Sequence, residues 1–138
     1  MRSRFAAIIA GLALWAGACS DPAAPAAPTP VAPTITDTYQ GTLVVGGSNP
    51  APLTVHAIGA VEVSVTSVDP PATIGVGIGT TSSAGACAAL QSRVVDPGTP
   101  PPQLVGTATT TGPSFCLLVF DVGQLTAPVS YTVSVLHP

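Results

Sequence analysis

The sequence predicts an all-β protein, an antiparallel β-sandwich of about seven or eight short strands after a signal peptide and a Pro/Ala-rich linker. Three observations support this fold class. Apolar residues alternate with polar or small ones across most of residues 37–138, which is the period of a half-buried strand. Clusters of Gly, Pro, Asp and Asn interrupt the alternation at short intervals. No apolar stripe with helical spacing follows residue 18. The expected strands lie near residues 39–45, 52–58, 60–68, 73–80, 86–91, 103–109, 114–122 and 128–136.

The chain begins with a short basic segment followed by an apolar one. Residues 1–4 hold two arginines, and the next 14 residues, 5–18, carry no charge. As a helix, residues 5–18 would span about 21 Å, shorter than the roughly 30 Å hydrocarbon core of a bilayer. This pattern is typical of a signal peptide rather than of a transmembrane helix. We therefore expect residues 1–18 to be a signal peptide and the protein to be exported.

The apolar segment ends in small residues ahead of a cysteine. Gly17, Ala18 and Cys19 resemble the lipobox of bacterial lipoproteins, although Ala16 stands where leucine is commonest in that family. The resemblance implies cleavage before Cys19 and lipidation of that residue, which would anchor the protein to a bacterial membrane. Each buried methylene contributes about 0.8 kcal/mol, so the lipid chains suffice for stable anchoring. Ser20 favours the outer membrane, by analogy with lipoprotein sorting. The alternative is ordinary secretory cleavage after Ala18, which leaves Cys19 as a free thiol.

A linker is expected between the cysteine and the folded domain. Residues 19–36 are rich in proline and alanine and contain too few large apolar side chains to bury a core. As an extended polyproline II segment they would reach about 50 Å. The alternative is simple disorder without a spacing role. Both interpretations leave residues 37–138 as the one folded domain.

The alternation takes different forms along this domain. Residues 61–66 alternate valine with polar side chains, as a half-buried strand does. Residues 74–79 alternate isoleucine or valine with glycine, which predicts a glycine face suited either to close packing or to a flat binding strip. Residues 115–122 are almost all apolar, which predicts a central strand covered on both faces. Residues 86–91 are the least regular strand, and a helical turn is the alternative there.

Two cysteines remain once Cys19 is assigned to the lipid. Cys87 and Cys116 form an even pair in an exported protein, which predicts a disulfide. Closing a loop of about 30 residues would stabilise the fold by roughly 3–4 kcal/mol. Two cysteines without a nearby histidine make a poor zinc site, so no metal site and no cofactor are predicted.

Charge excludes one class of partner. The chain has three cationic residues, all arginine, and two of them lie in residues 1–4. Arg93 is therefore the one cation expected in the exported chain, against six carboxylates. Because phosphate neutralisation needs clustered Lys and Arg, a nucleic-acid partner is excluded.

Few residues offer catalytic chemistry. His56 is expected to be a solvent-facing strand residue, and His137, next to the last residue, is expected to fray. Asp121 is expected to cap a turn at Gly123, with cation ligation as its alternative. A hydrolase would require His56 and two carboxylates in one cleft. We predict that the protein is not an enzyme.

The loops supply the remaining candidates. Asp69 and Asp96 each precede a proline, and their side-chain oxygens are expected to support turns. The loop Pro97–Pro102 is predicted to be exposed and is the favoured recognition loop, with Arg93 and Asp96 nearby.

Most of the domain resembles the bacterial pre-peptidase C-terminal-like domains, which are small β-sandwiches appended to exported proteins. Residues 37–43 look like their first strand and residues 61–68 like their Val/Thr-rich strand. Residues 115–121 followed by 131–135 look like their final hairpin. Members are commonly non-catalytic modules that bind polymers or assist secretion. Some bind calcium through acidic loops, whereas acidic residues here are sparse and separated.

These inferences predict a lipid-anchored protein of the cell envelope that presents a binding or assembly module. The expected partner is an envelope protein, bound by strand addition to a sheet edge, or a glycan. The single tryptophan lies in residues 1–18, so no aromatic platform for sugar is evident, which favours a protein partner. A passive structural protein is a further alternative, and a hydrolase-associated accessory domain is a less favoured one.

Overall fold

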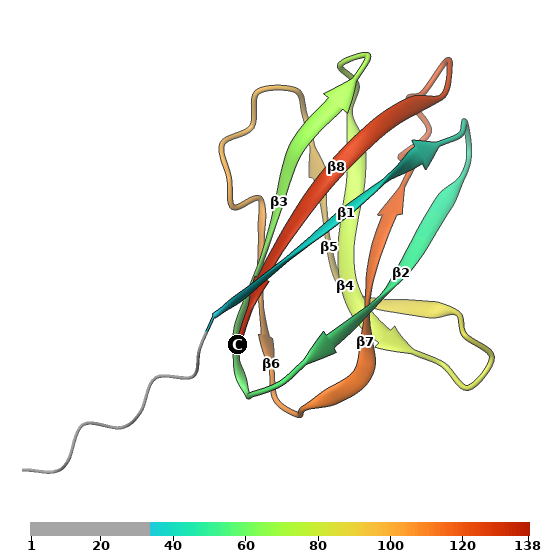
Figure 1. Ribbon diagram of the computed structural model, residues 1–138. Coiled ribbons are helices and arrows are strands. Elements are labelled where there is room, and N and C mark those ends of the chain that lie inside the picture. The colour runs from blue at the N-terminus through green and yellow to red at the C-terminus, as the bar shows by residue number, and fades with distance from the viewer. Residues whose placement is uncertain (1–33) are drawn as a thin grey trace, which may run out of the picture. The chain divides into compact units, whose positions relative to one another are not determined.

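The computed structural model describes residues 34–138, which form two packed β-sheets (Figure 1). The eight strands are β1 (Ile35–Leu43), β2 (Ser48–Val55), β3 (Gly59–Asp69), β4 (Ile74–Thr81), β5 (Cys87–Val95), β6 (Leu104–Ala108), β7 (Gly112–Phe120) and β8 (Val129–His137). One sheet has the order β1-β8-β3-β6 and the other the order β2-β7-β4-β5. Every pairing is antiparallel. The predicted fold class is confirmed.

The strand boundaries differ from the predicted ones mainly at the first, second and fifth strands. β1 begins at Ile35, two residues before the expected domain start at residue 37, because Ile35 pairs with His137 of β8. β2 begins at Ser48, four residues before the expected start at residue 52, and so includes Pro50. β2 lies at a sheet edge, where proline is tolerated. β5 runs to Val95 as a strand with one register shift against β4 at Leu90, so the helical-turn alternative for residues 86–91 is wrong.

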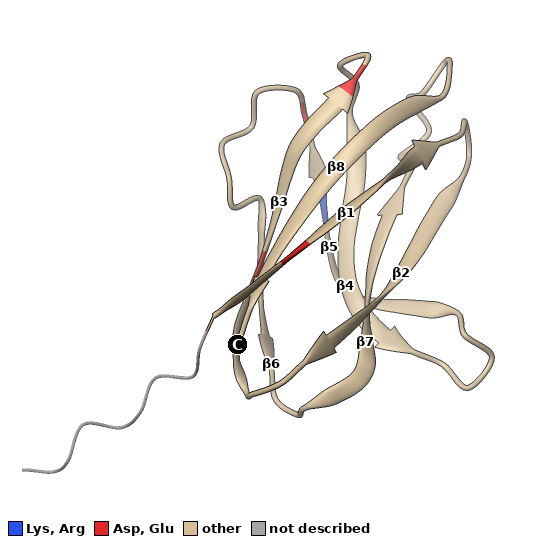
Figure 2. Ribbon diagram, in the orientation of Figure 1, with Lys and Arg blue, Asp and Glu red and all other residues tan. Residues whose placement is uncertain are grey.

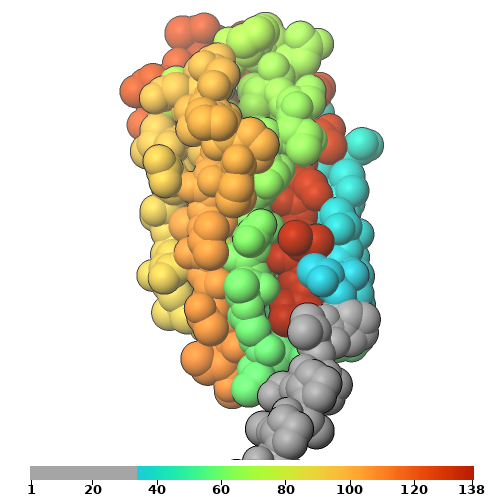
Figure 3. Space-filling model, turned by 90° about the vertical axis from the view of Figure 1, so that its left-hand side faces the viewer, coloured from blue at the N-terminus to red at the C-terminus, as the bar shows by residue number. Residues whose placement is uncertain are grey.

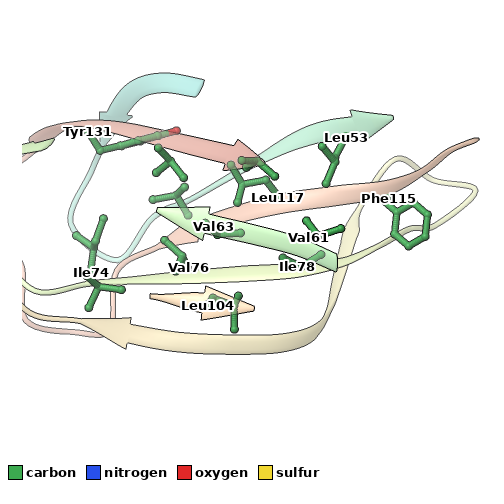
Figure 4. Close-up of a cluster of buried hydrophobic side chains, with 14 of the residues drawn as sticks. Leu53, Val61, Val63, Ile74, Val76, Ile78, Leu104, Phe115, Leu117 and Tyr131 are labelled. Atoms are coloured by element: carbon green, nitrogen blue, oxygen red, sulfur yellow. The ribbon is translucent and has the colours of Figure 1, made fainter. Parts of the chain in front are cut away.

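The core lies between the two sheets and is built from the alternate residues that the period-two pattern predicts (Figure 4). In β3, Val61 and Val63 face inward and are 2% and 0% exposed. The inward residues of β4 and β7 meet them from the opposite sheet. The buried apolar side chains of these two strands are Ile74, Val76, Ile78, Phe115, Leu117 and Val119.

The outward face of β4 is a row of glycines that neighbouring segments cover. A Cβ added at Gly75 would overlap the ring of Phe120, and one added at Gly79 would overlap the carbonyl oxygen of Ala88. Both glycines are buried. The close-packing alternative is therefore confirmed, and the flat binding strip does not form. On the outward face of the central strand β7, Leu118 and Phe120 are half-buried, so the cover predicted for both faces of this strand is only partial.

The last two strands do not form the final hairpin that the sequence suggested. β7 pairs with β2 and β4, whereas β8 pairs with β1 and β3 in the other sheet. The segment between them crosses from one sheet to the other, and its Leu125 is buried in the core. This crossing closes one end of the sandwich.

Candidate functional site: the open side of the sandwich

The two lateral sides of the sandwich differ in how their edge strands are covered. We call the side formed by β1 and β2 the closed side. There the Tyr39 hydroxyl donates a hydrogen bond to the carbonyl of Pro52 at 3.0 Å. The Asn49 amide nitrogen donates to the carbonyl of Thr42 at 2.9 Å. These contacts join the two sheets and occupy backbone acceptors of both edge strands.

The opposite side, which we call the open side, is formed by β5, β6 and the connecting residues 96–103. Figure 3 shows this connection and β6 (orange) between β5 (yellow) and β3 (green). β5 pairs only with β4, and its residues 88–94 are all exposed. Leu90 is 72% exposed, and Val94 of β5 and Val105 of β6 are each about half exposed. The open side therefore offers an unpaired strand edge with apolar side chains around it.

A groove of about 310 Å³ lies at the upper end of the open side. Its walls are the second half of β3 (residues 65–68), residues 71–72 after it, and the loop residues 96–99. β6 pairs with β3 only as far as Val63, so the chain between Val95 and Gln103 loops outward and leaves this space. The predicted recognition loop Pro97–Pro102 thus contributes its residues 97–99 to a wall of this groove.

Gln103 forms the floor of the groove and is the main polar residue that the sequence analysis missed. Its side chain is buried, with 2% of the residue exposed. The amide oxygen accepts from the backbone N–H of Val65 at 2.8 Å, and the amide nitrogen donates to the carbonyl of Thr99 at 2.9 Å. Its backbone N–H donates to the carbonyl of Val63 at 3.0 Å. The side chain therefore continues the β3 ladder for one further position. A lone glutamine after a proline run carries no sequence signal for this role.

Asp96 fixes the loop that borders the groove. Its backbone carbonyl accepts from the N–H of Thr99 at 3.0 Å, which closes the predicted turn. Its carboxylate accepts from the Thr73 hydroxyl at 2.8 Å, so the side chain joins the loop to the start of β4 rather than supporting the turn itself. Asp69 lies at the end of β3, where the structure gives its side chain no hydrogen bond.

Charge is distributed unevenly between the open side and the rest of the described residues (Figure 2). Residues 34–138 contain five carboxylates and one cation, Arg93, which lies exposed on β5. Among these residues, no carboxylate oxygen lies within 4.0 Å of its guanidinium nitrogens. The open side thus carries Arg93 without an ion-pair partner, together with the carboxylate of Asp96, which accepts from the Thr73 hydroxyl instead.

The predicted disulfide between Cys87 and Cys116 is confirmed, with their Cα atoms 5.8 Å apart. It joins the edge strand β5 to β7, although β4 lies between these strands in the sheet. The Ala88 backbone crosses close over Gly79 of β4, which brings β5 near β7 at this end. The disulfide therefore anchors the start of the exposed strand.

The two histidines lie at the base of the sandwich, outside the open side. His137 was expected to fray, and this is wrong: it is 1% exposed, because β8 continues to it and β1 covers it. Its Nε2 lies 3.0 Å from the Asp37 carboxylate, and its ring stacks on that of His56 at 6.5 Å between centroids. His56 itself is exposed, as predicted, but it lies just beyond the end of β2. The cluster that a hydrolase would need, His56 with two carboxylates, is not formed in residues 34–138.

Asp121 is a backbone cap, as predicted. Its Oδ1 accepts from the N–H groups of Gly123, Gln124 and Leu125, and its Oδ2 accepts from that of Gly46 at 2.7 Å. These hydrogen bonds lower the pKa of the carboxyl below its usual range, and the bond from Gly46 contributes most. Four donors already surround the carboxylate, and residues 34–138 contain no group of three or more side chains suited to hold a metal ion.

Several predicted features lie outside the described residues, among them Cys19, the signal peptide and most of the linker. Within residues 34–138, no helix has the length and hydropathy needed to cross a bilayer. Neither a protein-family model nor a curated protein matches the chain.

Proposed function

We propose that this protein is a non-enzymatic, lipid-anchored protein of the bacterial cell envelope whose β-sandwich is a binding or assembly module. The lipobox-like residues before Cys19 support the anchor, and Cys19 carries the lipid in this proposal. The observation that carries the binding function is the asymmetry of the sandwich. One side has its edge strands tied together, and the other leaves a strand edge and a groove accessible.

A polypeptide partner fits the open side better than a glycan does. Glycan sites commonly present an exposed aromatic face, and each Tyr and Phe ring of residues 34–138 is buried or half-buried. A free strand edge instead presents backbone N–H and C=O groups, which an extended chain satisfies by strand addition. Glycan binding and a passive structural role remain the alternatives against which the proposal is tested.

The experiment is crosslinking of the full-length chain in its native envelope, with identification of the captured species by mass spectrometry. We expect one dominant protein, whose capture is lost in Leu90→Glu on the open side. The matched control is Val44→Glu, which places the same charge at an exposed apolar residue on the closed side and should leave capture intact. Capture of equal strength in both variants, or no protein above background, would contradict the binding role.

The anchor is tested separately on the same material. We expect the mass of the N-terminal peptide to show diacylglycerol and an acyl chain on Cys19. We also expect Cys19→Ala to move the protein from the membrane fraction to the soluble exported fraction. An unmodified Cys19 in a protein cleaved after Ala18 would support the secreted alternative.

A further inference from the structure

The edge of β5 is long, exposed and free of hydrogen bonds from the opposite sheet. β1 is an edge strand of the same length, but its Thr42 carbonyl already accepts from the Asn49 amide of β2. β5 has nine residues, whereas β6, the other edge strand of the open side, has five. On the closed side, β2 contains Pro50 and Pro52, which have no N–H to donate to an added strand, and the Pro52 carbonyl already accepts from Tyr39. β5 contains no proline, and its described hydrogen-bond ladder is with β4 alone. An added strand therefore finds regularly spaced donors and acceptors on residues 91–95 of β5, up to the register shift at Leu90.

Arg93 gives this edge a charge preference. It lies in the second half of β5, exposed, with no carboxylate oxygen within 4.0 Å in the described residues. A residue placed directly opposite on an added strand would have its Cβ about 5 Å away on the same face of the sheet. An opposite charge at that position is stabilising and a like charge is destabilising. The strand that fits carries Asp or Glu opposite Arg93.

A second copy of β5 does not meet this requirement. In a two-fold pairing of β5 with itself, the residue opposite Arg93 comes from residues 87–95, which contain no carboxylate. At one of the registers the two arginines would face each other. The net negative charge of the described domain adds a weak repulsion between copies. The charge pattern thus disfavours self-pairing and favours a different polypeptide.

We propose that the free edge of β5 binds an extended strand of another polypeptide by antiparallel or parallel addition, with a carboxylate of that strand opposite Arg93. This rests on the proposed function, because it assigns the partner's chemistry at the open side. Leu90 and Val94 contact the apolar side chains of the added strand. The sheet then extends from four strands to five, with the order β2-β7-β4-β5 followed by the partner strand.

The test is an amide NMR titration of the 15N-labelled full-length chain in detergent micelles. The probe is an acetylated and amidated nonapeptide of alternating threonine and valine with one central glutamate, and its matched control has lysine in place of glutamate. We expect chemical-shift changes in β5 and β4 and none in β2. We expect the glutamate peptide to bind about threefold more tightly than the lysine peptide. The Arg93→Glu variant should reverse this order, and Arg93→Gln should abolish the preference.

Three results would overturn the proposal. The first is no shift in β5 at millimolar peptide. The second is binding without a preference that follows the charge at residue 93. The third is a β5 spectrum that changes with protein concentration in the absence of peptide, which would make a second copy the occupant. The titration requires neither a lipid nor an envelope, so its failure is distinguishable from failure of the crosslinking experiment, which tests the open side as a whole.

Discussion

The closed and open sides of the sandwich solve the same physical problem in different ways. Every open β-sheet has edges with unpaired backbone groups, and these promote unwanted pairing unless they are covered. The closed side covers them with side-chain hydrogen bonds from Tyr39 and Asn49 and with the prolines of β2. The open side leaves β5 uncovered but holds it in place with a disulfide at its start and a buried glutamine beyond its end. The difference indicates that β5 is kept rigid and accessible at once.

Among the changes that test this comparison, removal of the disulfide should have the largest effect on the free energy of unfolding. Cys87→Ser combined with Cys116→Ser should lower the free energy of unfolding by about 3–4 kcal/mol, because a loop with a sequence separation of 29 is no longer closed in the unfolded chain. Denaturant unfolding measures the loss. Hydrogen exchange should show faster exchange of β5 amides than of β1 and β2 amides. If the amides of the closed and open sides lost equal protection from exchange, the disulfide would have no specific role in holding the open side.

Removal of the buried amide is the next largest change. Gln103→Ala leaves the N–H of Val65 without its partner and should cost about 1–3 kcal/mol in unfolding free energy. Gln40→Ala, at an exposed position on β1, is the matched control and should be close to neutral. Urea unfolding of both variants measures the difference. If the two variants were equally stable, Gln103 would not be what holds the loop at the groove.

The closed side should respond more weakly to a single change. Tyr39→Phe removes the hydroxyl that donates to Pro52 and should cost about 0.5–1.5 kcal/mol. Partial burial raises the pKa of the Tyr39 phenol above its ordinary value of 10.0, and the nearby charge of Asp37 raises it further. This contribution to stability is therefore fully present below pH 10 and is lost as the pH rises through the higher folded-state value. Unfolding measured from pH 8 to 12 should show a steeper alkaline loss in the native chain than in Tyr39→Phe.

The smallest expected effect is at Asp121, which joins the β1–β2 turn to the segment after β7. Hydrogen bonds from Gly46 and the three following N–H groups lower the pKa of its carboxyl below 3.8. A lowered folded-state pKa contributes stability that is present above pH 3.8 and is lost as the pH falls through the folded value. Asp121→Asn should be less stable than the native chain at pH 7, and the gap should close below pH 3.8.

The control for this prediction is another carboxylate in the same domain. Glu62 accepts no side-chain hydrogen bond from the described residues, so Glu62→Gln is the control and should be close to neutral for stability at pH 7. Acid titration of unfolding, followed by circular dichroism, compares the three proteins. Asp121→Asn is also compared with the native chain at pH 2, where a remaining difference in unfolding free energy would contradict the prediction. Such a difference would show that the geometry of the cap, rather than its charge, stabilises the fold.

The sequence alone predicted every strand that the structure describes, because a period-two pattern is a local property that burial of one strand face imposes. The even number of cysteines left after Cys19 predicted the disulfide. An aspartate two residues before a glycine predicted the cap at Asp121. The prediction failed where a residue's environment is made by chain that is distant in sequence. His137 reads as a fraying terminal residue, yet Asp37, 100 positions earlier, lies against it.

The tertiary structure alone decided which strands share a sheet, and with that it decided where the two sides lie. Residues 115–121 and 131–135 read as a hairpin, but hydrogen bonding to more distant strands places them in opposite sheets. Local alternation determines which face of a strand is buried and carries no information about which strand lies beside it. The groove, the role of Gln103 and the free edge of β5 all follow from that pairing. A sequence with this pattern therefore determines a sandwich, and the long-range register determines which of its sides is left open.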